Sequence, residues 1–333
     1  MTNSTTHPNL TRTPKGLLSS IPLIPKLLTN MIVKQRIAPK RLGNPKTPSD
    51  YGMEYTAVDI QTPDNIRLSA WEIIHPDSKK VAIINHPLTC TRYGTETGLD
   101  GVPVEFLPMV KHLFDAGYSI VMYDQRGQGE SDGGIGENAI GREVPVGAGI
   151  TEWQDLVGAL EHVAQHQELA DNQIALVTQC MGANAAIIAW NKAPDAFDLS
   201  KVKCHVAIQP TLSYNMTYRF IRSKLRMDLA DKVEAAQIEK VGFGFSNVLE
   251  HIDKVRVPML FSQVREDQYT FDTGTGINDV QVIYDQCPTE KQMVWIGTKE
   301  ANPFGTGKRF DGYKYFNERP EELLAFLETY VSK

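Results

Sequence analysis

The side chain best suited to covalent chemistry is Cys180, which stands between a short apolar run and a run of small residues. Residues 174–179 precede it, and Met181-Gly182-Ala183-Asn184-Ala185-Ala186 follow it. This order predicts a strand, a tight turn and a helix, with Cys180 at the exposed apex of the turn. The Met181 amide would then face the position of a developing oxyanion. Cys180 is therefore a candidate nucleophile; the alternative is an inert packing cysteine, a common fate of buried thiols.

Hydrophobic runs and periodic segments alternate along most of the chain. Strands are expected at 55–60, 66–74, 80–85, 119–123, 174–179, 202–208, 257–263 and 292–296, and helices at 106–116, 151–166 and 321–331. Alternating strands and helices favour an α/β fold with a mostly parallel eight-stranded sheet and helices on both faces. The domain is expected to span 51–333. A helical insertion at about 211–256 is too long for a connection, which predicts a short lid over one edge of the sheet.

Three further motifs follow predicted strands. They are Asn85-His86-Pro87-Leu88, Asp124-Gln125-Arg126-Gly127-Gln128-Gly129-Glu130-Ser131, and Arg265-Glu266-Asp267. Together with the turn at Cys180, these motifs resemble the α/β-hydrolase superfamily over roughly residues 51–333, the second one matching its D-x-R-G-x-G-x-S loop. The cysteine at the apex is similar to that of dienelactone hydrolases.

The resemblance implies roles for individual residues. Leu88 and Met181 would supply the oxyanion-hole amides, and Asp267, or second Glu266, would be the acid. It implies neither a cofactor nor a metal. The family also has a catalytic histidine after its last strand, but the last histidine here is His251.

The segment where that histidine is expected, 296–316, offers other ionisable side chains, namely Lys299, Glu300, Lys308 and Arg309. A cysteine depends less on a base than a serine does, because a free thiol has a pKa near 8.5 and its thiolate is intrinsically nucleophilic. Lys308 or Arg309 would favour the thiolate or contact an anionic group of the substrate. His86 is a candidate substitute base, although the family residue at this place is usually structural.

Composition and charge restrict the cellular compartment and the classes of partner that we expect. A net charge of −6 argues against nucleic acid as a partner, and four cysteines without a CxxC pair predict neither a disulfide framework nor a zinc site. We expect a cytoplasmic protein without a membrane-spanning segment. Residues 1–50 form a basic arm with one acid, Asp50. Its amphipathic segment Lys26–Arg36 would pack on its own domain or touch a membrane or a partner.

Two function classes remain. The first is a hydrolase or acyltransferase that acts on an ester or thioester through an acyl intermediate on Cys180. Its small-molecule substrate would carry an apolar acyl or aryl group, which the lid side chains Tyr214, Met216, Tyr218, Phe220, Phe243 and Phe245 suggest. The second is a non-catalytic member of the fold that binds a small apolar ligand or serves as a scaffold. The sequence leaves the oligomeric state open.

Overall fold

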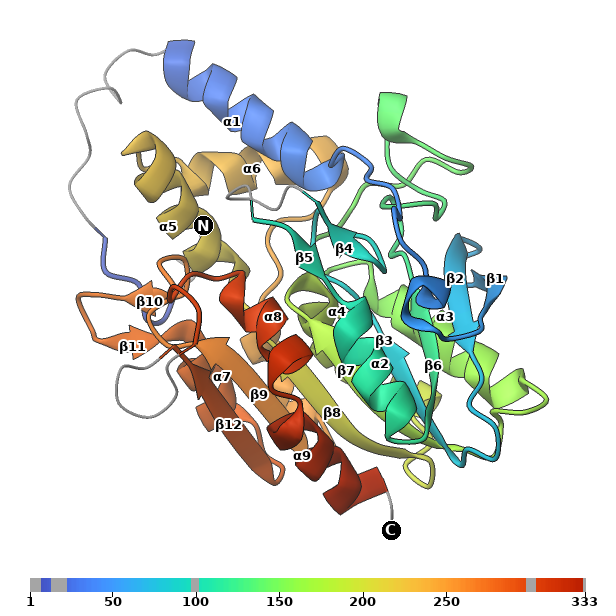
Figure 1. Cartoon of the computed structure of the whole chain (residues 1–333). Helices are drawn as coiled ribbons and strands as arrows, with labels where there is room; N and C mark the ends of the chain where they lie inside the picture. Colours follow the sequence, from blue (N-terminus) through green and yellow to red (C-terminus); the bar gives the residue numbers. More distant parts are fainter. Residues whose placement is uncertain (1–6, 13–22, 97–101, 298–303, 332–333) are drawn as a thin grey trace.

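One large sheet organises the molecule (Figure 1). The computed structural model describes residues 7–12, 23–96, 102–297 and 304–331, and within these ranges eight strands form the sheet in the order β1-β2-β6-β3-β7-β8-β9-β12. The strands are β1 (Thr56–Gln61), β2 (Arg67–Ile73), β3 (Lys80–Ile84), β6 (Tyr118–Tyr123), β7 (Gln173–Gln179), β8 (Val202–Ile208), β9 (Met259–Val264) and β12 (Lys291–Ile296).

The pairing of the strands confirms the predicted fold class. β1, β2 and β6 pair antiparallel, and β6, β3, β7, β8, β9 and β12 pair parallel. The inner parallel strands are nearly continuous in apolar residues because helices cover both of their faces. All six parallel strands therefore end at one edge of the sheet, where ligands of open α/β sheets bind.

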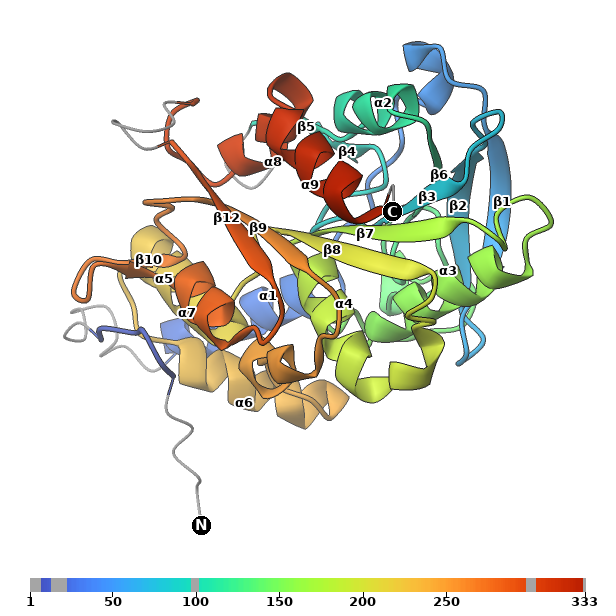
Figure 2. The same ribbon diagram turned by 90° about the horizontal axis from the view of Figure 1, so that it is seen from below.

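Helices cover both faces of the sheet (Figure 2). On one face lie α2 (Leu107–Asp115), α8 (Asp311–Glu318) and α9 (Glu321–Val331), and on the other lie α3 (Trp153–Gln165), α4 (Met181–Lys192) and α7 (Asp279–Gln286). Each layer seals its own buried apolar cluster against the sheet. Burial of apolar surface, at roughly 25 cal/mol per Å², is the main stabilising contribution of these layers.

The 211–256 segment forms two helices, α5 (Ser213–Leu225) and α6 (Ala230–Val241), followed by short 3₁₀ turns at Val248–Glu250 and Ile252–Lys254. The arm contributes α1 (Leu23–Ile37), which packs on α6. Ile32, Val33 and Ile37 of α1 share a buried cluster with Ile221 and Val233 of α5 and α6. This arm helix thus packs on the rest of the chain, with Leu27 and Met31 left exposed.

Smaller elements complete the fold. Two-residue ribbons form from β4 (Gly94–Thr95) with β5 (Val104–Glu105), and from β10 (Phe271–Asp272) with β11 (Ile277–Asn278); further 3₁₀ turns lie at Pro48–Tyr51, Gly136–Asn138 and Pro194–Ala196. Residues 7–12 lie against the second ribbon and the lid. Within the described ranges, no helix combines the length and apolar character that a bilayer crossing needs.

Candidate active site

Cys180 lies at the turn between β7 and α4 and has strained backbone angles, φ 49° and ψ −111°. A non-glycine residue rarely adopts a positive φ, so the surrounding structure must hold it there. The Cys180 amide donates to the Ile208 carbonyl at 2.8 Å, and its carbonyl accepts from Asn184 at 2.9 Å. The thiol is thus presented at the carboxyl edge of the sheet, as the sequence pattern predicts.

The turn at Cys180 requires a small residue at position 182 but not at position 178. A Cβ added at Gly182 would lie 2.2 Å from Asn85 Oδ1, so this position is closed to larger residues. Thr178, by contrast, faces β8, where its Oγ1 donates to the Val206 carbonyl and lies 2.7 Å from His205 Nε2. A glycine is required after the thiol but not two residues before it.

Arg309 is the residue that the structure brings to the sulfur. Its side chain is 2% exposed. Nη2 donates to Cys180 Sγ at 3.2 Å and Nη1 donates to Asp267 Oδ2 at 2.8 Å. One guanidinium therefore joins the thiol to the carboxylate.

Asp267 is held for this contact by the turn after β9. It is fully buried and also accepts from the Tyr269 amide at 3.1 Å and from Thr270 Oγ1 at 3.2 Å. Glu266, the second acid suggested by the sequence, is exposed and points no carboxylate into this network. The structure thus gathers Cys180, Asp267 and Arg309 and leaves Glu266 outside.

The electrostatic balance around Arg309 keeps it charged. Burial opposes the charge, but the neighbouring Tyr313, Cys180 and Asp267 outweigh it and raise the pKa of Arg309 well above its ordinary value. Burial raises the pKa of the Tyr313 hydroxyl, which hydrogen-bonds to Cys180, and the opposing charge of Arg309 does not cancel this effect. A guanidinium has five donors and no acceptor, so Arg309 can stabilise a negative sulfur but cannot take up its proton.

The turn that carries Arg309 is itself anchored. The Arg309 carbonyl accepts from Gln209 Nε2 at 2.8 Å, and Asp311 accepts from the amides of Thr306 and Lys308 at 2.7 and 3.0 Å. Gly312 is the second residue of α8, and a Cβ added there would lie 2.5 Å from the Gln209 side chain. Sequence reasoning missed Gln209 and Tyr313 as site residues. The four-residue spacing of Arg309 and Tyr313 is a signal that could have identified Tyr313, whereas the sequence carries no such signal for Gln209.

The two other cations of the predicted set have different positions. Lys308 is exposed and faces away from the thiol's buried environment, while Lys299 lies outside the described residues, as does Glu300. Of the ionisable side chains expected near the site in this segment, Arg309 alone is placed against Cys180 in the described part of the chain.

His86 is not brought to the thiol. It is 1% exposed; its Nε2 accepts from the Gln125 amide at 2.9 Å and its Nδ1 lies 2.8 Å from the Pro87 carbonyl. Burial lowers its pKa. Both ring nitrogens are thus engaged in fixing the loop after β6, so His86 is a structural residue and not a substitute base.

Of the two residues predicted to form an oxyanion hole, Met181 follows the thiol directly and Leu88 lines the same cavity as Cys180. Met181 opens α4, where the first four amides lack helical acceptors. The Leu88 amide has no acceptor among the described residues, and its turn is fixed by Thr89, which has φ 62° and donates its amide to Gln128 Oε1 at 2.7 Å. Their role as oxyanion donors stays a prediction.

A cavity of about 100 Å³ opens onto the sulfur. It lies between the turn after β3, the first turn of α8 and the helices α1 and α5. Its described lining is mostly apolar: Ile32, Gln35, Arg36, Pro87, Leu88, Thr89, Cys90, Thr95, Cys180, Met216, Thr217, Phe220, Arg309, Phe310 and Tyr313. Of the lid side chains named from the sequence, Met216 and Phe220 reach this cavity.

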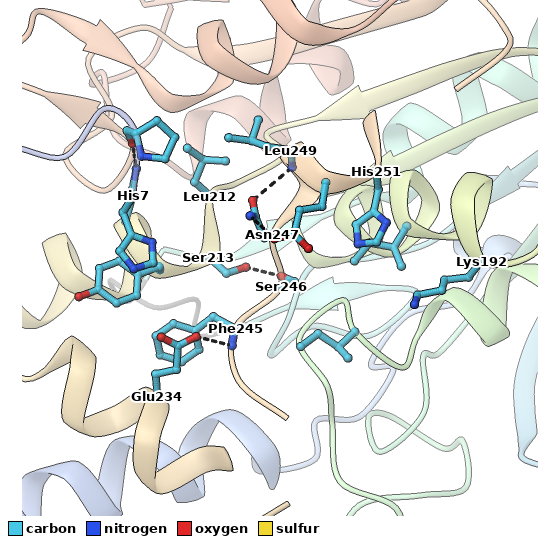
Figure 3. A pocket seen from close by; sticks show the side chains of 16 residues that line it. His7, Lys192, Leu212, Ser213, Glu234, Phe245, Ser246, Asn247, Leu249 and His251 are labelled. Atoms are coloured by element: carbon cyan, nitrogen blue, oxygen red, sulfur yellow. Dashed lines mark hydrogen bonds between the residues drawn. The ribbon is translucent and has the colours of Figure 1, made fainter. Parts of the chain in front are cut away.

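A second, larger cavity has a volume of about 330 Å³ and is lined in part by Ser213 and Tyr214 of α5. Figure 3 shows Ser213 and Ser246, whose Oγ atoms are 2.5 Å apart, between His7 on one side and Lys192 on the other. The lid residues Tyr214 and Phe245 line this cavity and not the one at Cys180. None of the four cysteines, all of which are free, lines it.

Metal ions in proteins are held by groups of His, Cys, Asp or Glu side chains. Within the described ranges, no three His, Cys, Asp or Glu side chains are grouped in a way that would hold an ion. The arrangement at Cys180 suits nucleophilic attack by sulfur beside a fixed cation.

This sheet order, with the tight turn at Cys180 after β7 and Asp267 after β9, is that of the α/β-hydrolase fold. The family model described as serine aminopeptidase, S33, matches residues 104–241, less than half of the chain but including the turn at Cys180. A search of curated protein sequences finds no match.

Solved structures share the fold. An esterase from Pyrococcus furiosus is 20% identical with a TM-score of 0.62, over 89% of this chain and 98% of that one. An α/β hydrolase from a Penicillium species is 16% identical with a TM-score of 0.54, over 84% and 100%. A dienelactone hydrolase from Anabaena variabilis is 13% identical with a TM-score of 0.51, over 84% and 99%. Because the sequence identities are 20% or less, the similarity to these structures establishes the fold alone.

Proposed function

We propose that the chain is an α/β hydrolase that forms an acyl intermediate on Cys180 from a thioester or an activated ester. One observation carries the proposal: Arg309 Nη2 lies 3.2 Å from Cys180 Sγ while its Nη1 binds Asp267. A cation held against a thiol at a helix N-terminus is the environment of a reactive cysteine. The esterase and dienelactone hydrolase among the structural neighbours agree with chemistry on an ester bond.

Acylation would begin with attack of the Cys180 thiolate, whose proton has passed to solvent, on the carbonyl carbon. The bond from this carbon to the leaving group would then break, and the leaving group would depart with the electron pair. The carbonyl oxygen would become negative next to the Leu88 and Met181 amides, and such donors typically contribute about 10²- to 10³-fold in rate each. Arg309 would stabilise the sulfur before attack, and its bond to Asp267 fixes it for that purpose. No proton has to reach Arg309 in this step.

No imidazole lies beside Cys180 in the described part of the site, and this determines which leaving groups we expect. An alkoxide needs a proton as it departs, whereas a thiolate or a phenolate leaves unaided because its conjugate acid is much stronger. We therefore favour thioesters and aryl esters over alkyl esters. The apolar lining from Ile32, Met216 and Phe220 suits the hydrocarbon part of an acyl or aryl group.

Breakdown of the acyl intermediate would be the slow step. A general base is worth about 10²- to 10⁴-fold in rate, and neither Arg309 nor the buried Asp267 that it binds is free to activate water. The proposal therefore covers slow hydrolysis and, equally, acyl transfer to an acceptor that is a better nucleophile than water.

The test is intact-mass spectrometry after brief exposure to p-nitrophenyl acetate and, separately, to a short acyl thioester of N-acetylcysteamine. Wild type is compared with Cys180→Ala and with Cys90→Ala. We expect one acyl adduct that forms in wild type and in Cys90→Ala and is lost in Cys180→Ala. Cys90 is the matched control because it lines the same cavity, and because burial raises the pKa of its thiol.

The second candidate function is a ligand-binding or scaffold role without catalysis. The specific observation in its favour is that Arg309 stands between nucleophile and acid and cannot accept a proton. The same measurement separates the two: absence of any adduct, or an adduct shared by Cys90 and Cys180, would reject the covalent mechanism and leave binding as the function.

A further inference from the structure

The described residues that line the cavity at Cys180 carry a positive charge that none of them compensates. None of the described residues that line it is acidic, whereas two are cationic, Arg36 and Arg309. Arg309 is neutralised by its bond to Asp267 at 2.8 Å. Arg36 therefore sets the charge of the cavity.

Arg36 is half-buried and differs from the buried arginines in the described part of the chain. Arg92, Arg126, Arg219 and Arg309 each pair with at least one carboxylate. Arg36 instead donates Nε to Gln237 Oε1 at 3.1 Å and Nη1 to Thr217 Oγ1 at 3.0 Å, both neutral groups. Among the described residues no carboxylate lies within ion-pair distance of it, and its Nη2 is buried without a hydrogen-bond partner.

The surroundings of Arg36 are also costly for a cation. The Phe245 ring lies 4.2 Å from the Arg36 guanidinium, and this cation–π contact offsets only part of the cost. Burial lowers the pKa of Arg36 to about 10, against the weaker opposing attraction of Glu234 and Glu152. A buried charge without a partner is destabilising, so a site that keeps one gains when an anionic ligand supplies the partner.

We propose that Arg36 binds a carboxylate at the far end of the acyl group, so that the preferred substrates are monothioesters or activated monoesters of short dicarboxylic acids. This rests on the proposed function, since it assigns the acyl group that reaches Cys180. The carboxylate would lie at Arg36 and the hydrocarbon linker against Met216 and Phe220. A cavity of about 100 Å³ is well below the roughly 300 to 1,000 Å³ of sites for drug-sized ligands, which restricts the acyl group to a short chain.

The experiment compares two thioesters of N-acetylcysteamine that differ in charge but little in shape, the succinyl and the succinamoyl thioester. The rate of adduct formation at Cys180 is measured by mass spectrometry for both, and their ratio is taken within each variant. We expect wild type to favour succinyl about 10- to 100-fold, the usual range for a hydrogen bond to a charged group. Arg36→Met should bring the ratio close to one, and Arg36→Lys should retain part of it.

Lys34→Gln is the matched control, because it removes one positive charge from the same helix. Lys34 is exposed, pairs with Glu137 and does not line the cavity. The ratio in this variant should stay at the wild-type value. Using a ratio also separates binding of the carboxylate from the structural contacts of Arg36 with α5 and α6, which affect both substrates alike.

A binding measurement distinguishes failure of this inference from failure of the proposed function. Succinamate, which carries the same carboxylate without a reactive bond, is titrated calorimetrically into wild type and Arg36→Met. If no thioester acylates Cys180 but succinamate binding depends on Arg36, the covalent mechanism is wrong and the anion site stands. Equal acylation rates for the two thioesters in wild type, or no Arg36-dependent binding when no acylation occurs, would overturn the anion site.

Discussion

Arg309 joins Cys180 to Asp267 through two nitrogens of one guanidinium group. A Ser/His/Asp site uses an imidazole at this place, which both takes a proton and returns it. The guanidinium can do neither, but it remains charged at every accessible pH. The cysteine and the arginine therefore belong together: a sulfur nucleophile needs a cation more than it needs a base.

Replacing Arg309 by Met should slow alkylation of Cys180 by iodoacetamide, a neutral reagent, by about tenfold or more, because a charge-assisted hydrogen bond to the sulfur is lost. Peptide mapping by mass spectrometry at pH 7 would follow Cys180 separately from the other thiols. Lys308→Met is the control, since Lys308 is the exposed neighbour of Arg309. An equal rate in wild type and Arg309→Met would show that the contact does not activate the thiol.

At this scale the sequence predicted part of the site. Cys180 and Asp267 follow from their positions after predicted strands, and Arg309 was named among four ionisable residues of one segment. Its role as the bridge between the other two depends on a side-chain conformation that no spacing encodes. Tyr313 and Gln209 were missed, because the first depends on an unpredicted helix and the second on a contact between two loops that are distant in the sequence.

At the scale of elements, all eight strands of the sheet were predicted. Buried parallel strands leave long apolar runs, and the antiparallel pair β1 and β2 is indicated by two strand-like segments around a turn. The helices α7 and α8 were not. The α8 sequence DGYKYFNE has few strong helix formers, and it is helical because Tyr315 and Phe316 are buried against the sheet. The position of Arg36 at the cavity could not be predicted either, because nothing in the arm's sequence indicates that α1 reaches the cavity.

A short N-terminal segment, residues 7–12, is tied to the β10–β11 ribbon. The Thr11 amide and Oγ1 donate to Asp272 at 2.5 and 2.8 Å. Burial favours the neutral carboxyl, but these bonds and those from Thr275 and Gly274 outweigh it and lower the pKa of Asp272 to about 2. The folded pKa lies below the unfolded value near 3.9, so the anchor is at full strength above that value and is lost as the pH falls toward 2.

Asp272→Asn should therefore release residues 7–12 at neutral pH, where wild type holds them. Hydrogen–deuterium exchange with mass spectrometry, expressed as protection relative to the unfolded peptide, would show protection in this segment reduced several-fold. Asp253→Asn serves as the control, because Asp253 is exposed and pairs only with the neighbouring Lys254. Unchanged protection in Asp272→Asn would mean that other contacts hold the segment.

At the scale of the whole molecule, the apolar core contains a buried polar pair, Thr178 of β7 and His205 of β8. Thr178 donates to the Val206 carbonyl, so its Oγ1 accepts from His205 Nε2 at 2.7 Å. His205 is fully buried in β8, and its Nδ1 has no partner among the described residues. Burial lowers the pKa of His205 to about 3. The core therefore holds this histidine neutral.

The folded pKa of His205 lies below the unfolded value of 6.5, so its contribution to stability is present above pH 6.5 and is lost as the pH falls toward 3. Between pH 7 and pH 5 this group alone should lower the free energy of unfolding by about 2 kcal/mol. Urea denaturation at both pH values would measure the loss. His205→Gln should remove this part of the difference, whatever its effect on absolute stability.

The matched control is His75→Gln, which replaces a partly exposed histidine after β2 and should keep the wild-type pH dependence. If His205→Gln does not fold, the imidazole resonances of wild type give the same answer, since His205 should not titrate between pH 7 and pH 5. Titration of His205 in that range, or an unchanged pH dependence in His205→Gln, would mean that protons reach this core. The strand and turn that present Cys180 would then themselves loosen in mild acid, because Thr178 and His205 join β7 to β8 directly below the thiol.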